Sequence, residues 1–210
     1  PPPLDKPRVK RSDYRSAGEY FEALCERESI QITFKKPLAF KGIAFLREPL
    51  IPGRYSLSSY SEEFSIGGVP PNPENLLDRP NSPFLFVERM LRPEERKKYP
   101  HAKYLRFEKN SSDSTQPLIQ PISELSAVYG YIVRGTESFN DREAGIWGGE
   151  IILVDLRTGE AVGIRRAFGR DAVDTSYADR VRYWSHPCLG AGGRDYSHFL
   201  FNMLQTKEQK

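Results

Sequence analysis

The 210-residue sequence contains few of the residues that most often take part in catalysis or metal binding: three histidines, two cysteines and two methionines. The histidines lack a metal-ligand spacing such as H-x-x-x-H, and neither cysteine has a second one nearby, so no zinc signature is present. There is no G-x-S-x-G motif, and no glycine-rich piece follows a strand and opens a helix as a phosphate loop requires. No apolar run approaches the 18 residues of a membrane span. We therefore expect no metal, no other cofactor, no transmembrane segment and no catalytic residues.

An excess of charge of one sign is also missing. The sequence has 31 Lys and Arg against 28 Asp and Glu, a formal net charge of +3. Its most basic stretch, from Arg89 to Lys109, places aromatic residues between the charges, as nucleic-acid-binding surfaces do. Alternating charge around a strand and a turn is nevertheless more typical of a solvated face. We therefore expect no nucleic-acid partner.

Proline, by contrast, is concentrated at the N-terminus. Four prolines and four charged residues fall between Pro1 and Lys10, a composition typical of an extended, solvated chain. We predict a flexible linker over residues 1–11 and a single domain over residues 12–206. Neither an initiator methionine nor an apolar signal region precedes the linker. The missing methionine and signal region have two explanations, which we weigh equally. The linker is a tether that follows a processed signal or a lipid-anchored cysteine before Pro1, or the sequence was truncated at this point.

Helical periodicity is clearest near the two ends of that domain. Residues 13–28 carry an apolar stripe at spacings of three and four. Ser12 and Asp13 offer N-caps just ahead of it, and Ser16 with Glu19 has the spacing of a capping box one turn later. The stripe consists of Ala17, Tyr20, Phe21, Leu24 and Cys25. A second apolar stripe predicts a closing helix from Tyr196 to Leu204.

Between these helices the pattern is that of strands. Apolar runs predict strands near residues 30–34, 39–46, 84–91, 103–107 and 126–133, and Pro93 suits the first position of a short helical turn. The segment from Glu150 to Phe168 has two apolar runs around a polar, glycine-containing turn, which predicts a hairpin. Residues 49–83 are rich in proline and predict a long irregular loop, a kind of loop that is often functional. This order predicts an α+β domain with a mainly antiparallel sheet.

The two cysteines, Cys25 and Cys188, lie on the first helix and just before the last one. A bond between them would join both ends of the domain, and it would place the protein in an oxidising compartment such as the periplasm. We favour this disulfide because there are only two cysteines and each lies near a terminal element. The alternative is a pair of unrelated buried thiols in a cytosolic protein.

A second alternative makes Cys188 a nucleophile. His186 and His198 lie close to it in sequence, and Asp195 could orient a base. Proximity in sequence is weak evidence for a catalytic arrangement, because such partners meet through the fold. Pro187 also suits a rigid turn beside a bridged cysteine.

Two loops have the composition of a surface for a protein partner. Within residues 49–83, tyrosine and serine mix with glycine, as in adaptable binding loops. The second loop, Arg134 to Trp147, frames aromatic residues with charges, which is typical of interface anchors. The candidate partner-binding residues are Tyr55, Tyr60, Phe64, Glu137, Phe139, Asp141, Arg142 and Trp147. Each aromatic residue could instead pack beneath its own loop.

Several landmarks resemble a family of small exported bacterial envelope proteins. In the N-terminal half these are Tyr20 to Glu28, with its Phe21-Glu22-Ala23-Leu24-Cys25 run, followed by Lys41-Gly42-Ile43. In the C-terminal half they are Asp141-Arg142, Trp147, Val154 to Glu160, and Trp184 with His186-Pro187-Cys188. The likeness covers about half of the chain, and the sequence departs from the pattern at Lys41, where an acidic residue is usual, and in residues 49–83.

Members of this family are encoded beside type VI secretion lipase effectors, and they include the Tli-like periplasmic immunity proteins. The resemblance therefore implies a periplasmic immunity protein, with or without a lipoprotein anchor, whose partner is a toxic lipase or phospholipase. It implies no catalytic residues. The functions that compete with this one are an envelope thiol enzyme that uses Cys188 and a structural or accessory envelope lipoprotein.

Overall fold

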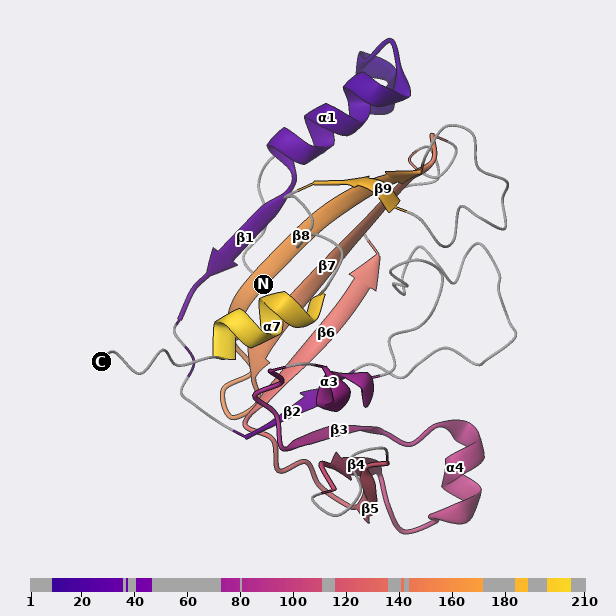
Figure 1. Cartoon of the computed structure of the whole chain (residues 1–210), viewed down its shortest axis with the longest axis vertical. Coiled ribbons are helices and arrows are strands. Elements are labelled where there is room, and N and C mark those ends of the chain that lie inside the picture. The colour runs from indigo at the N-terminus through magenta and orange to yellow at the C-terminus, as the bar shows by residue number, and fades with distance from the viewer. Residues whose placement is uncertain are drawn as a thin grey trace.

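Figure 1 shows the computed structural model of the chain. The structure describes residues 9–35, 37, 41–46, 73–79, 81–110, 116–135, 141, 144–171, 184–188 and 196–204. In this part of the chain, no helix is long and apolar enough to cross a membrane.

The described residues form one sheet of nine strands with helices packed on it. The strands are β1 (Ile30–Thr33), β2 (Gly42–Phe45), β3 (Phe86–Met90), β4 (Tyr104–Glu108), β5 (Leu118–Ile122), β6 (Tyr129–Gly135), β7 (Ile146–Asp155), β8 (Ala161–Asp171) and β9 (Trp184–Pro187). Their order is β1-β8-β7-β6-β2-β3-β4-β5, and β9 also pairs with β8. Only β2 is parallel to its neighbours, β3 and β6; the other described pairings are antiparallel. The predicted α+β class with a mainly antiparallel sheet is therefore confirmed.

The predicted first helix is α1 (Ala17–Arg27). It begins after Ser16, because the Ser16 hydroxyl oxygen accepts a hydrogen bond from the Glu19 N–H at 3.1 Å. The Glu19 carboxylate accepts from the N–H of Arg15, one residue before the position expected in a capping box. Ahead of the helix, Arg11–Asp13 form the 3₁₀ turn η1. The closing helix, α7 (Tyr196–Leu204), has its predicted bounds, and α4 (Pro93–Lys98) begins at Pro93 as expected.

The two faces of the sheet carry different layers. On one face, α7 and the short helix α3 (Asn75–Asp78) cover the main core (Figure 1). Gly163 of β8 lies on this face, because a Cβ there would meet the Met203 side chain of α7 at 2.7 Å. Phe168 of β8 packs instead against α1 in a second, smaller core. Side chains alternate between the two faces along a strand, and Gly163 and Phe168 are separated by an odd number of positions. They therefore belong to opposite faces, so α7, which contacts Gly163, and α1, which contacts Phe168, lie on opposite faces of the sheet.

The main core joins strands from both halves of the sheet to α3 and α7. Its buried side chains come from β2, β3, β4, β6, β7 and β8, and the central hairpin strand is buried on both faces as predicted. They include Ile43, Phe45, Leu77, Val87, Leu105, Phe107, Tyr131, Leu153 and Phe199. Since these residues span the sequence from β2 to α7, the described sheet behaves as one packed unit.

Some features differ from expectation. Two strands, β5 and β9, were not predicted, because each contains a proline, Pro121 and Pro187. Both strands lie at edges of the sheet, where a missing N–H is tolerated. Helix α3 lies inside the range predicted as an irregular loop, while residues 49–72 and 80 of that loop lie outside the described residues. Val9, within the predicted linker, already packs against the α1 core and donates its N–H to Glu28.

The turn of the predicted hairpin is fixed by Asp155 and Gly159. Asp155 accepts hydrogen bonds from the N–H and guanidinium of Arg157, and its own N–H bonds to the Glu160 carbonyl at 2.9 Å. Gly159 has a φ of +72°, a conformation that glycine adopts without strain. The hydrogen bonds from the Arg157 side chain lower the pKa of Asp155 to about 2.

This lowered pKa predicts an acid-sensitive contribution to stability. The Asp155 carboxyl takes up a proton near pH 2 in the folded protein and near pH 3.8 when it is unperturbed. The unfolded state therefore binds more protons between these values, and stability falls as the pH decreases through this range. In urea titrations at pH 5, 4, 3 and 2, the stability difference between wild type and Asp155→Asn should shrink towards low pH. A difference that stays constant with pH would show that this carboxyl does not contribute.

Candidate functional site

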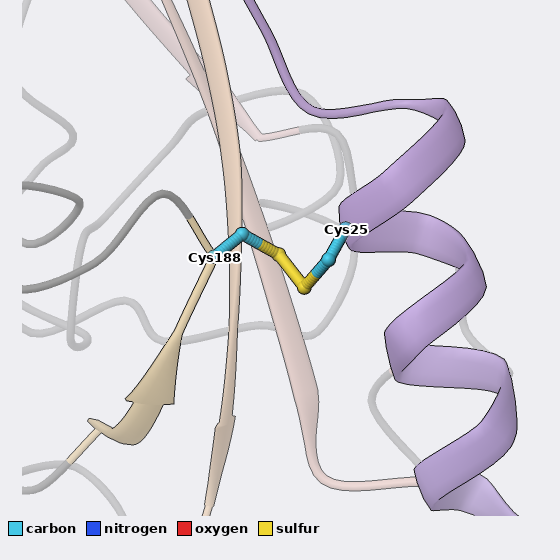
Figure 2. The surroundings of a disulfide bond; sticks show 2 residues. All are labelled: Cys25 and Cys188. Carbon is cyan, nitrogen blue, oxygen red and sulfur yellow. A yellow bond between two sulfur atoms is a disulfide. The ribbon is translucent and has the colours of Figure 1, made fainter.

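The predicted disulfide is present between Cys25 of α1 and Cys188, the residue after β9. Figure 2 shows the bond reaching from the helix to the end of that strand. The two Cα atoms are 5.2 Å apart, within the range that an unstrained bond requires. The Cys188 N–H also bonds to the carbonyl of Phe168 in β8 at 2.8 Å. The helix is thus joined covalently to a residue that is held on the sheet.

Around this bond, α1 forms a small core of its own. Six buried residues make up this cluster, which we call the α1 core: Tyr20, Phe21, Leu24, Ile146, Phe168 and Cys188. They come from α1, the start of β7, the end of β8 and the residue after β9. Four chain segments that are distant in sequence therefore meet at one end of the sheet.

A buried polar pair fixes a loop to this core. The hydroxyl of Tyr20 donates a hydrogen bond to the carboxylate of Asp141, and both side chains are buried. Asp141 lies in the segment between β6 and β7, and its carbonyl accepts the N–H of Ala144 at 3.0 Å. Because a buried carboxylate requires such partners, the bond holds the base of this segment against α1.

Charged side chains stabilise the same face of the sheet beneath α1. Arg166 of β8 donates from Nη2 to the buried Glu150 of β7 at 2.6 Å, and its Nη1 lies 4.0 Å from the Glu28 carboxylate after α1. Glu28 in turn accepts the N–H of Val9. This chain of contacts links the N-terminal segment, the end of α1 and the hairpin.

The structure places the predicted partner-binding residues in three groups. Tyr55, Tyr60, Phe64, Glu137, Phe139 and Arg142 lie outside the described residues. Trp147 belongs to β7, where only its backbone is described. Asp141 is fully buried, so its carboxylate anchors the loop and does not face a partner. Sequence reasoning took Asp141 for a surface charge because its burial depends on Tyr20, which is 121 positions away.

The bond also bears on the alternative in which Cys188 is a nucleophile. Attack requires a thiolate, and the sulfur of Cys188 is bound to that of Cys25 in a residue that is only 5% exposed. His186 lies in β9 and His198 in α7, and the side chains of both are outside the described part of the structure. Within the described residues, no group of three or more His, Cys, Asp or Glu is placed to hold a metal ion.

Part of the basic stretch from Arg89 to Lys109 is used inside the protein. Arg89 is 2% exposed, donates to Glu74 at 2.8 Å and to both oxygens of Glu95, and lies over the ring of Phe107. Burial alone would lower the pKa of Arg89, but its hydrogen bonds to Glu95 and Glu74 and the charges of these residues raise it. The guanidinium therefore stays charged and ties the segments of α3 and α4 to β3.

Glu88, the neighbour of Arg89, is also buried and paired within the protein, on the opposite face of β3. It is fully buried and accepts from Arg106 of β4 at 2.7 Å and from the N–H groups of Ser126 and Ala127 at 3.0 Å. The sequence could have suggested the pair, since Glu88 and Arg106 face each other across two predicted strands. Their burial could not be inferred, because it depends on the return of the chain at Ser126.

Removing the disulfide should destabilise the protein strongly. The bond closes a loop of 163 positions, and loss of a native disulfide from a small domain costs about 2–5 kcal/mol. Urea denaturation of Cys25→Ala/Cys188→Ala should show this loss. Wild type reduced with a thiol and alkylated is the matched control and should lose a similar amount. Equal midpoints for the oxidised wild type and the double variant would contradict a stabilising role for the bond.

No protein-family model matches the sequence, and no curated protein is similar to it. Among solved structures, the chain is similar to a dodecamer of PelC from Paraburkholderia phytofirmans. The match covers 85% of this chain and 98% of the PelC chain, at 11% sequence identity and a TM-score of 0.37. Similarity at this level does not assign the chain to a family.

Proposed function

We propose that this protein is a periplasmic binding protein that neutralises a toxic protein partner by covering part of its surface, and that it is not an enzyme. The Cys25–Cys188 disulfide carries this proposal. Such bonds persist in oxidising compartments and are rare in the cytosol of most organisms. With both cysteines bonded to each other, the thiol chemistry that an enzymatic role would use is not available in the oxidised protein.

The arrangement of the loop between β6 and β7 supports a binding role. Its two stems are held side by side, with Gly135 paired to Gly149, and Asp141 fixes a point between them to α1. A segment that is restrained at three places loses less conformational entropy when a partner binds it. Phe139 and Arg142 belong to this segment and are our candidate contacts, together with Tyr60 of the loop over residues 49–83.

The partner class comes from the family resemblance. Immunity proteins of that family are encoded beside type VI secretion lipase effectors, so we propose that the partner is a lipase or phospholipase that acts on the envelope. A formal net charge of +3 supplies little long-range attraction. Recognition would then depend on aromatic and charged side chains of the two loops, as in interfaces with an apolar core and a charged rim.

The test takes the proteins encoded by the neighbouring genes, among which the proposal predicts a lipase-like effector, and titrates them with the oxidised full chain. We expect a Kd below 1 µM by calorimetry, and loss of lipase activity at one equivalent. Phe139→Ala or Tyr60→Ala should weaken binding by about tenfold or more, as expected for interface anchors. Glu124→Ala, at an exposed position between β5 and β6, is the control and should bind as the wild type does. Absence of both binding and inhibition would contradict the proposal.

A further inference from the structure

Exposed apolar side chains gather at one end of the sheet. Four large apolar residues are strongly exposed in the described structure, and three of them lie at or beside β3 and β5: Leu85, Leu118 and Ile119, at 48%, 48% and 53% exposure. The end of the sheet formed by β3, β4 and β5 lies far from α1 (Figure 1). An apolar concentration of this kind at a surface is typical of an interaction site.

The strand register assigns these side chains to faces. Ile119 lies opposite Phe107, whose side chain belongs to the main core, so Ile119 shares the face covered by α3. Leu118 lies opposite Glu108 and points to the other face. Leu85 precedes β3 at a bend, where its N–H bonds to the Lys41 carbonyl and its carbonyl accepts the N–H of Lys109, so the strand register does not assign its side chain to a face. Ile119 therefore lies on the face that carries α3, while Leu118 does not.

A hollow opens on that surface between α3 and the β4–β5 hairpin. Its volume is about 270 Å³, and it is lined by Leu77, Asp78, Lys109, Asn110, Gln116 and Pro117. This volume is below the range of about 300–1,000 Å³ that is typical of small-molecule sites. The hollow suits one large side chain of a protein better than a cofactor.

The two charged residues at the rim of the hollow, Lys109 and Asp78, differ in their contacts with the rest of the protein. The Lys109 ammonium donates to the carbonyl of Ser82 at 3.1 Å and is thereby drawn to the protein. Asp78, in the last turn of α3, is exposed, and no described cation forms an ion pair with it. Among the described residues, the rim therefore offers the exposed carboxylate of Asp78 next to the side chains of Leu77 and Pro117, which complements a basic group next to an apolar one.

The edge of β5 does not favour the addition of another strand. Pro121 has no N–H, so it can occupy only a position whose backbone points away from β4, and Ile119, two residues earlier, shares this orientation. Within the strand, the outer edge thus offers one N–H, that of Ile119. A partner at this surface must contact side chains, because the backbone ladder is interrupted.

We propose that the hollow between α3 and the β4–β5 hairpin docks an apolar side chain of a partner protein, next to a Lys or Arg of the same segment that pairs with Asp78. This inference rests on the proposed binding function and assigns it a second contact surface, distinct from the two loops. The apolar side chain would cover Leu77 and Pro117, with Ile119 on the same face of the sheet.

The probe is N-acetyl-Leu-Arg-amide, titrated to millimolar concentration into the oxidised full chain and followed by amide NMR. We expect saturable shifts at the residues that line the hollow and at Ile119. N-acetyl-Gly-Arg-amide and N-acetyl-Leu-Glu-amide should bind at least threefold more weakly. Asp78→Asn should remove the preference for arginine over glutamate. Ile119→Glu should abolish the shifts, whereas Leu118→Glu, an equally exposed change on the opposite face, should leave them unchanged.

Several outcomes would overturn this inference. Shifts elsewhere, or equal shifts with the three peptides, would show that the hollow lacks the proposed chemistry. Shifts of the same residues on raising the protein concentration alone would show that a second copy occupies the surface. The failure of this inference can be told apart from that of the proposed function. If the lipase binds Ile119→Glu as tightly as wild type, the binding function stands and only this surface is rejected. If the lipase does not bind the wild type at all, the proposed function fails.

Discussion

The bond between Cys25 and Cys188 is the constraint on which one half of this structure depends. Helix α1 lies on the face of the sheet opposite the main core, where, among the described residues, the small α1 core, its partly buried neighbours and a few polar contacts hold it. The longest strand, β8, pairs with β7, β1 and β9, and the disulfide connects α1 to the residue that follows β9. The bond therefore adds a covalent restraint where apolar burial is small.

The other half of the sheet contains buried, paired ions. These charges stabilise the fold and must be distinguished from charges that could contact a partner. Arg89 and Glu88 are buried ions on opposite faces of β3, each satisfied by partners from neighbouring segments. Removing one partner of such a pair is costly, so these residues specify the packing of the chain and are poor candidates for recognition. The surfaces that we propose for a partner are the segment anchored at Asp141, the loop over residues 49–83 and the hollow beside α3.

Elements with strong local signals could be predicted from the sequence. The stripe through Tyr20 and Leu24 gave α1, and the apolar runs around Gly159 gave the hairpin. Strands β5 and β9 could not be predicted, because their prolines and polar residues form a strand only when a neighbour supplies the ladder. The cysteine pair was inferred correctly because only one pairing exists. Asp141 was misassigned to the surface and Arg89 to a solvated face, since the burial of each depends on contacts made by the whole fold.

The most direct test of this account is native-state hydrogen exchange of the oxidised and the reduced protein. We expect amides of α1 and of β7 to exchange with similar, high opening free energies while the disulfide is intact. After reduction, α1 should lose most of its protection by local opening, while β6 and β7 keep theirs, because the main core does not depend on the bond. If α1 instead remains as protected as β7 after reduction, the disulfide is not the constraint that holds this end of the protein.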